Sequence, residues 1–313
     1  MRALIFPGQG SQFVGMGQSL YTASPACKAV FEEVDDSIDF ALSKLMFSGD
    51  AETLRLTEHV QPALMAVSIA LIRLWLEKTE SADISSFCSA VAGHSLGEYS
   101  ALSAAGAIKI SDTARILKAR GAAMQKAVPV GEGGMVAVLG LDIEAVSSLA
   151  AEISKSSGVC EVANDNAQGQ VVLSGSASAM QAVVEQAKAH GAKRALALPV
   201  SAPFHCSMMG YARDVMVERL ADLSISVPVV PCYANVDTMP TRDIEVIREN
   251  LKMQICAPVR WRESVMRMAE EGFERFVEVG AGKVLGGLQK RIVPDATSVS
   301  LQEYDDLVAF LEL

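Results

Sequence analysis

The sequence predicts an α/β protein with two parts, a large domain built on a mostly parallel sheet and a small domain inserted into it. In residues 1–128 and again in 200–313, short apolar strands alternate with helical patterns. Such alternation is typical of a parallel sheet covered by helices on both faces. Residues 129–199 follow a different order of elements. We therefore expect the large domain to comprise residues 1–128 and 200–313, and the small domain residues 129–199.

The large domain is expected to begin with a buried strand at residues 2–6, which ends at the turn-forming sequence Pro-Gly-Gln-Gly-Ser-Gln. Further along, an apolar strand at 89–92 runs directly into a helical pattern at 96–105. The other elements predicted from apolar periodicity are helices at 24–46, 61–77, 111–128 and 261–271, and a strand at 275–279.

The small domain is predicted from the order strand, helix, strand, strand, helix, strand. This βαββαβ order is typical of a ferredoxin-like unit. The strands are expected at residues 135–139, 160–163, 171–174 and 194–198, and the helices at 143–156 and 177–190.

Composition and charge limit the classes of function. Half of the 313 residues are apolar and a fifth are charged, which allows a sizeable core and argues against disorder. The net charge is −10 and no run of lysine or arginine occurs, so nucleic acid is not expected as a partner.

The cysteines and the N-terminus indicate the compartment. The six cysteines are scattered, without a C-x-x-C pair or zinc-like spacing, which favours free thiols in a reducing cytosol and no metal site. No basic leader precedes the first strand, and no apolar run is expected to reach membrane-spanning length. We therefore expect a cytoplasmic protein without a membrane segment. We also expect a monomer that needs no cofactor.

Residues 93–97 read Gly-His-Ser-Leu-Gly, at the point where the strand at 89–92 meets the helix at 96–105. This is the G-x-S-x-G nucleophile elbow in the strand–turn–helix setting that it requires in α/β-hydrolase-like folds. The glycines permit a strained turn beside the backbone. Ser95 is therefore expected to project its hydroxyl at the helix N-terminus, where free N–H groups can stabilise an oxyanion. A glycine-flanked turn without catalysis is the alternative.

A serine hydroxyl needs a base to become a nucleophile, and the chain has four histidines. His190 stands at a helix end and is interpreted as structural, His59 as a surface residue, and His94 as a buried residue of the elbow. His205, in Ser-Ala-Pro-Phe-His-Cys, is the best base by elimination.

Arg120 lies in the middle of an apolar helix face. Because burying an unpaired guanidinium is costly, it must meet a carboxylate or a similar anion. Either an internal Asp or Glu or a substrate carboxylate, which suits the planar fork of arginine, satisfies this requirement. The residues that share its face are Ile116, Leu117, Ala123, Met124 and Ala127.

Taken together, these residues resemble one family, the malonyl-CoA:acyl-carrier-protein transacylases of fatty acid synthesis. The matches run in the family's order along essentially the whole chain, and together they are far more specific than any one of them. The matching strings are Phe-Pro-Gly-Gln-Gly-Ser-Gln (6–12), Gly-His-Ser-Leu-Gly-Glu-Tyr (93–99), Arg120, Gln-Val-Val-Leu-Ser-Gly (170–175), Pro-Phe-His (203–205), Asn-Val-Asp (235–237), Gln254 and Glu-Val-Gly-Ala-Gly (278–282).

The resemblance implies a ping-pong acyl transfer. Ser95 attacks the thioester of malonyl-CoA, His205 takes the proton, and a malonyl-serine intermediate forms. The phosphopantetheine thiol of acyl carrier protein then takes the malonyl group. The resemblance places the oxyanion on the backbone N–H groups of Gln9 and Leu96.

The resemblance also implies the substrate contacts. Arg120 pairs with the malonyl carboxylate, Gln254 helps to position that site, and Phe204 before His205 is similar to malonyl-type enzymes. A backbone carbonyl near Asn235 is expected to orient the histidine, without an acidic side chain in the triad role.

Three alternatives remain open. A free-standing acyltransferase of a polyketide pathway has almost the same sequence. A serine esterase or thioesterase shares the elbow, but it needs a histidine near the C-terminus, and no histidine follows His205. A non-catalytic binding subunit is expected to have lost Ser95, His205 or Arg120, and all are present.

Overall fold

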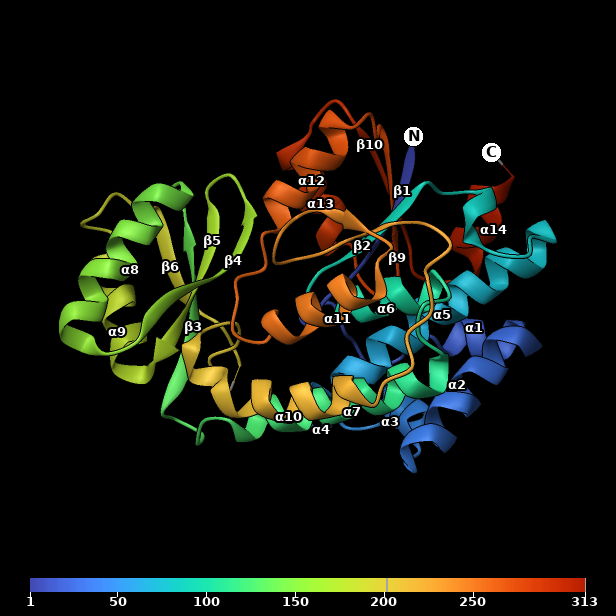
Figure 1. Ribbon diagram of the computed structural model, residues 1–313, viewed down its shortest axis with the longest axis horizontal. Helices are drawn as coiled ribbons and strands as arrows, with labels where there is room; N and C mark the ends of the chain where they lie inside the picture. The colour runs from blue at the N-terminus through green and yellow to red at the C-terminus, as the bar shows by residue number, and fades with distance from the viewer. Residues whose placement is uncertain (201, 313) are drawn as a thin grey trace.

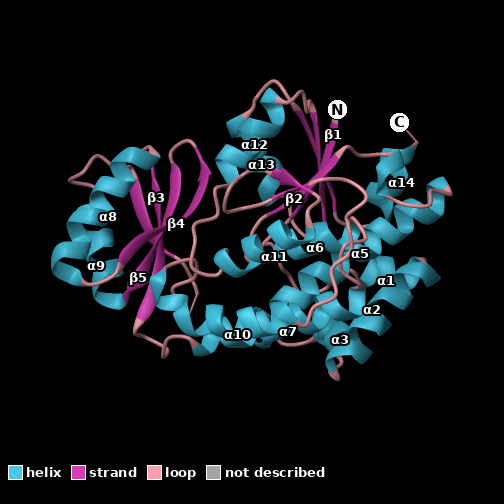
Figure 2. Ribbon diagram, viewed as in Figure 1, coloured by secondary structure: helices cyan, strands magenta, loops and turns pink. Residues whose placement is uncertain are grey.

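The computed structural model describes residues 1–200 and 202–312, which form two sheets that lie beside one another (Figures 1 and 2). All neighbours in the six-stranded sheet are parallel, except the antiparallel pair at one edge. Its order is β10 (Thr297–Leu301), β9 (Arg275–Val279), β1 (Arg2–Phe6), β2 (Ala90–Gly93), β7 (Cys232–Tyr233) and β8 (Pro240–Thr241). This mostly parallel sheet confirms the predicted α/β class.

The central strands of this sheet are buried on both faces, which explains why they read as continuous apolar runs. In β1, Leu4 and Phe6 face one core, and Ala3 and Ile5 face the other. The first core includes helices α2 (Pro25–Ile38), α5 (Thr57–Thr79), α6 (Leu96–Ala104), α7 (Ile110–Lys126), α10 (Gly210–Ala221) and α11 (Ile244–Met253). The second includes α12 (Trp261–Glu270) and α13 (Val284–Ile292).

Helix α5 corrects one expectation from the sequence. By length and composition it is apolar enough to cross a membrane, although no such run was expected. In the fold, 83% of its most apolar stretch is buried inside the protein. A helix that is apolar all round is typical of the centre of a large core, and α5 packs against α2, α6 and α7.

The four-stranded sheet has the order β4 (Cys160–Ala167), β5 (Gln170–Ser176), β3 (Gly133–Leu139) and β6 (Arg194–Ala197), and every pair is antiparallel. Helices α8 (Ile143–Ser157) and α9 (Ala177–Gln186) pack on it. This arrangement confirms the ferredoxin-like βαββαβ unit. The division of the chain into domains at residues 128 and 199 stays a prediction.

Three helices differ from the sequence-based expectation, and one of them is α5, which begins four residues early, at Thr57. The predicted helix at 24–46 is two helices, because Asp39 adopts a left-handed backbone (φ 49°) between them. Helix α9 ends at Gln186, four residues early, and the chain then turns to Gly191. The remaining helices are α1 (Gln18–Ala23), α3 (Leu42–Ser48), α4 (Ala51–Arg55), α14 (Tyr304–Leu311), and the short 3₁₀ turns Ile84–Ser86 and Ser207–Met209.

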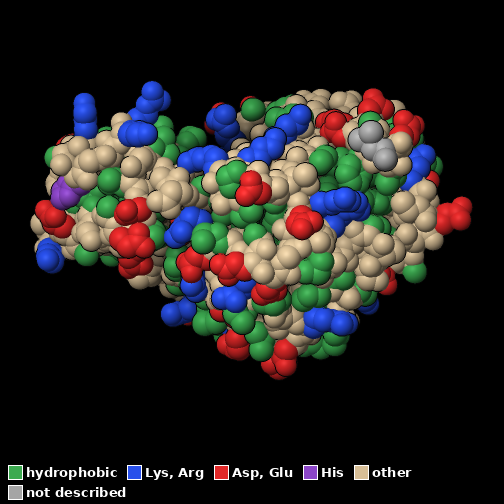
Figure 3. Space-filling model, turned by 90° about the horizontal axis from the view of Figure 1, so that it is seen from above, with side chains coloured by type: hydrophobic (Ala, Val, Ile, Leu, Met, Phe, Trp, Pro, Cys, Tyr) green, Lys and Arg blue, Asp and Glu red, His purple; other side chains and the backbone are tan. Residues whose placement is uncertain are grey.

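Contacts from strand β4 of the small sheet to a helix and a turn beside the large sheet fix the relative position of the two sheets. Asp165 on β4 forms an ion pair with Arg262 on α12 at 2.8 Å, and this carboxylate is buried. Glu161, also on β4, accepts a 2.8 Å hydrogen bond from the backbone N–H of Ser207. Seen from above, acidic and basic side chains are mixed over the surface, with basic ones over both parts of the molecule (Figure 3).

Candidate active site

The elbow lies where the carboxyl end of β2 meets α6. Ser95 has φ 53° and ψ −109°, a strained backbone for a residue with a side chain. The flanking glycines are required by space: a Cβ on Gly93 would overlap the backbone of Gly97, and one on Gly97 would overlap the carbonyl of Phe6. This packing holds the serine hydroxyl above the edge of the sheet, where ligands of parallel sheets bind.

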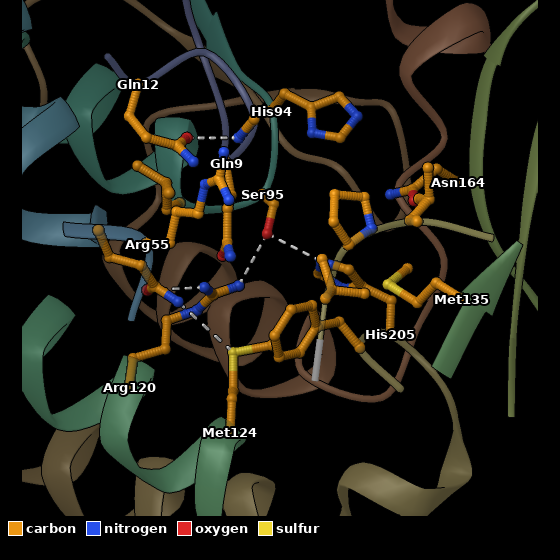
Figure 4. A pocket seen from close by; sticks show the side chains of 17 residues that line it. Gln9, Gln12, Arg55, His94, Ser95, Arg120, Met124, Met135, Asn164 and His205 are labelled. Atoms are coloured by element: carbon orange, nitrogen blue, oxygen red, sulfur yellow. Dashed lines mark hydrogen bonds between the residues drawn. The ribbon is translucent and has the colours of Figure 1, made fainter. Parts of the chain in front are cut away.

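Ser95 and His205 meet although 110 residues separate them. The Ser95 hydroxyl is 2.8 Å from His205 Nε2 (Figure 4), and His205 Nδ1 is 2.9 Å from the backbone carbonyl of Gln254. A carbonyl only accepts, so Nδ1 carries the proton and Nε2 accepts from the serine. Burial, assisted by the charge of Arg120, lowers the pKa of His205 to about 3. The imidazole is therefore an uncharged base at neutral pH.

The carbonyl that orients His205 was expected near Asn235, and this expectation was wrong. The Asn235 carbonyl accepts from the backbone N–H of Arg260. Its side chain braces the elbow instead: Oδ1 accepts from the Ser95 N–H at 2.7 Å, and Nδ2 donates to the Gly93 carbonyl at 2.7 Å. The reason is topological, because Asn235 follows β7, which neighbours β2 in the sheet.

Arg120 projects from α7 toward the serine (Figure 4) and is 1% exposed. Its guanidinium donates to Gln61 Oε1 at 2.9 Å, to Gln254 Oε1 at 2.8 Å and to the Ser95 hydroxyl at 3.0 Å. Every one of these acceptors is uncharged. Within residues 1–200 and 202–312, no ion pair to Arg120 is formed and its buried Nε has no hydrogen-bond partner. The internal salt bridge that the sequence left open is therefore absent from the described residues.

These groups line a cavity of about 390 Å³ between the two sheets. Gln9 and Leu96, expected at the oxyanion, and Phe204, expected at the substrate, contribute to its wall, and so does Asn164 from the small sheet. The backbone N–H groups of Gln9 and Leu96 have no hydrogen-bond partner among the described residues. Gly8 brings the loop of Gln9 against the elbow, since a Cβ there would come within 2.7 Å of the His94 carbonyl.

The other histidines have structural contacts. His94, expected to be buried, is half-buried in the cavity wall, and its Nε2 lies 2.8 Å from Asn166 Oδ1. His59 was expected on a surface loop, but it stands in the first turn of α5 and stacks on Phe40. His190 lies 3.9 Å from Glu152.

Two residues of the site were missed at the level of the sequence. Gln61 holds Arg120, and Glu98, one turn after the nucleophile, accepts a hydrogen bond from Gln254. Both are buried polar residues with apolar neighbours on their helices, and this pattern could have identified them. In the part of the chain that is described, no cluster of three His, Cys, Asp or Glu side chains could hold a metal ion.

Comparison with known sequences identifies related proteins. The family model of the acyl transferase domain matches residues 3–299. The malonyl CoA-acyl carrier protein transacylase of Escherichia coli strain K12 is 42% identical over 311 residues, covering 99% of both chains. The protein of the same name from Bacillus subtilis strain 168 is 43% identical over 290 residues, which cover 93% of this chain and 90% of the relative.

Comparison with solved structures identifies the same family. An acyl-carrier-protein S-malonyltransferase from Bartonella henselae is 45% identical, with a TM-score of 0.96 over 99% of this chain and 98% of its own. A malonyl-transacylase in complex with its type II polyketide synthase acyl-carrier protein is 40% identical, with a TM-score of 0.94 over 99% of both chains. With its elbow, its cavity and these relatives, the chain belongs to the acyl transferase family, among the malonyl-CoA:acyl-carrier-protein transacylases.

Proposed function

We propose that the protein transfers the malonyl group from malonyl-CoA to the phosphopantetheine thiol of acyl carrier protein, for fatty acid synthesis. One observation carries this proposal. A serine with a hydrogen-bonded base shares its cavity with a buried arginine that forms no direct ion pair within the described residues, since the amide of Gln254 separates it from Glu98. A buried guanidinium needs an anion, and a malonyl group supplies a carboxylate a few bonds away from its reactive carbonyl.

In the first half-reaction, Ser95 Oγ attacks the thioester carbonyl while His205 Nε2 takes the hydroxyl proton. The tetrahedral intermediate places its oxyanion toward the Gln9 and Leu96 N–H groups, which are free to donate. Collapse breaks the carbon–sulfur bond, and His205 returns the proton to the leaving thiol of CoA. The product is a malonyl ester on Ser95.

In the second half-reaction, the phosphopantetheine thiol of the carrier protein occupies the position that CoA has left. His205 takes the thiol proton, the sulfur attacks the ester carbonyl, and the proton returns to Ser95. Both steps exchange an acyl group between a thiol and a hydroxyl, so we propose that no cofactor takes part. We further propose that the enzyme works in the cytoplasm as a monomer; its six cysteines are free thiols, as a reducing compartment requires.

We expect Arg120→Ala to change substrate selectivity more than folding. Losing the partner of the malonyl carboxylate in a buried site should cost about 2–5 kcal/mol of binding. Acetyl-CoA has no carboxylate on its acyl group. Its kcat/KM should fall only by the contribution of the Arg120–Ser95 hydrogen bond. The ratio of kcat/KM for malonyl-CoA to that for acetyl-CoA should therefore fall by about 10²–10³-fold, with Arg120→Lys in between.

The matched control for this variant is Arg115→Ala. Arg115 lies on the same helix, but its side chain is exposed and pairs with Asp112. In Arg115→Ala, the ratio of kcat/KM for malonyl-CoA to that for acetyl-CoA should stay within about twofold of the native value, because most exposed residues contribute little. Equal losses for both substrates in Arg120→Ala, together with a lower melting temperature, would show that Arg120 is only a structural residue.

The whole proposal is tested by incubation with malonyl-CoA alone, followed by mass spectrometry of the intact protein. A transacylase accumulates one malonyl adduct, because the acceptor thiol is missing. An esterase or thioesterase releases malonate with turnover, and a binding subunit gives neither adduct nor turnover. A polyketide acyltransferase gives the same adduct, and it is distinguished by comparing carrier proteins of the two pathways as acceptors.

A further inference from the structure

A buried carboxylate that takes no part in the chemistry above lies directly behind the nucleophile. Glu98 is the third residue of α6 and is 2% exposed. Its Oε2 accepts two hydrogen bonds, from the Asn235 N–H at 2.9 Å and from Gln254 Nε2 at 2.8 Å. Glu98 therefore contacts the residue that braces the elbow and the residue that holds both His205 and Arg120.

The side-chain amide of Gln254 has a defined orientation. Its Nε2 faces only acceptors: Glu98, the Ser95 carbonyl at 3.1 Å and Asn235 Oδ1 at 3.3 Å. Its Oε1 faces a donor, Arg120 Nη2. A flipped amide would place an NH₂ group against the guanidinium and an oxygen against a carboxylate. Glu98 is the one charged acceptor among these acceptors, and a charge-assisted hydrogen bond is the stronger kind, so Glu98 adds most to the hold on Nε2.

We propose that the ionised carboxylate of Glu98 is a positioning residue for the acyl transfer. It holds the Gln254 amide with its oxygen toward Arg120, and thereby sets the guanidinium for the substrate carboxylate. The inference rests on the proposed function and adds a residue that controls the preference for malonyl over acetyl groups.

Protonation of Glu98 weakens its hold on the Gln254 amide. Both hydrogen bonds end on Oε2, so the proton would go to Oε1, and Oε2 would keep both bonds without the strengthening that the negative charge gives them. Burial raises the pKa of Glu98 to about 7, further raised by Asp237 after β7 and opposed by Arg120 on α7. The other titratable groups beside it, Tyr99 on α6 and Cys232 on β7, stay neutral, because burial raises the pKa of both.

The test follows the ratio of kcat/KM for malonyl-CoA to that for acetyl-CoA between about pH 5.5 and pH 8.5. In the native enzyme the ratio should fall about tenfold as the pH drops through 7, the size of one charge-assisted hydrogen bond. The substrate carboxyl, with a pKa of about 3.5, and His205, with a pKa of about 3, do not titrate in this range. Glu98→Gln keeps the shape of the side chain and should give a low ratio that does not depend on pH.

Glu278→Gln is the matched control. Glu278 on β9 is also fully buried, burial raises its pKa as well, and it accepts from the Leu285 and Gly286 N–H groups outside the cavity. Its loss should lower the melting temperature and leave the ratio and its pH dependence as in the native enzyme.

Two results would overturn the inference: a native ratio that is constant over this pH range, or the same pH dependence in Glu98→Gln as in the native enzyme. If Glu98→Gln does not fold, the native profile and that of Arg120→Ala decide, since the ratio of the latter should be low and flat. A ratio in Arg120→Ala equal to the native one would instead refute the role of Arg120 in the proposed function.

Discussion

Replacing Ser95 with alanine should abolish the malonyl adduct and reduce acyl transfer on the order of 10⁶-fold, as loss of the nucleophile does in serine hydrolases. The Ser95 hydroxyl lies at the centre of the site, donating to His205 and accepting from Arg120. Neither partner can form the ester by itself. The measurement is the intact mass of the variant after incubation with malonyl-CoA, together with the rate of transfer to acyl carrier protein.

The thiols are the competing nucleophiles in this experiment. Cys206 follows His205, but burial raises the pKa of its thiol to about 11, so the reactive thiolate is scarce. Cys256 is the one cysteine that is not fully buried, and Cys256→Ala is therefore the control, in which the adduct should persist. An adduct that remains in Ser95→Ala and maps to either cysteine would assign the intermediate to a thioester.

Replacing His205 with alanine should slow the formation of the acyl-enzyme by about 10²–10⁴-fold, the usual contribution of a positioned general base. The Ser95 hydroxyl then has no acceptor for its proton, although the oxyanion donors and Arg120 remain. Rapid-quench measurement of acylation by malonyl-CoA gives the rate directly.

The pH dependence of the native enzyme provides a second check on His205. Because its pKa is lowered to about 3, the imidazole stays uncharged from pH 8 down to pH 5, and it loses its function as a base only at lower pH. Acylation by acetyl-CoA should therefore be nearly independent of pH over this range. The control for His205→Ala is His190→Ala, which removes a histidine in the turn after α9, beside Glu152, and should acylate at the native rate. An acylation rate in His205→Ala within tenfold of the native rate would contradict its role as the base.

Local patterns in the sequence predicted the elements that carry the site. The strand, elbow and helix around Ser95 agree with β2 and α6 within one residue. The predicted βαββαβ order agrees with β3 to β6, although α9 ends earlier than expected. These features depend on periodicity, on glycine and on turn chemistry, all of which act between neighbouring residues.

Contacts between residues that lie far apart in the chain were harder to predict from the sequence. His205 was chosen by elimination among four histidines, and the structure brings it to Ser95 across the sheet. The carbonyl behind it was assigned to the wrong residue, since a backbone carbonyl has no side-chain signature. Asn235 faces the elbow because it follows β7, and β7 lies next to β2 in the sheet. This pairing of strands cannot be read from the sequence.

By itself, the sequence determined the α/β class and the ferredoxin-like unit, and it predicted Ser95 as the nucleophile and the need of Arg120 for an anion, because apolar periodicity and the cost of burying a charge can be read from single segments. The tertiary structure alone decided what Arg120 meets and how Glu98, Gln254 and Asn235 connect it to the serine and the histidine. Hydrogen bonds depend on distances of a few tenths of an ångström and on direction, and only the packing of the two sheets and their helices sets these.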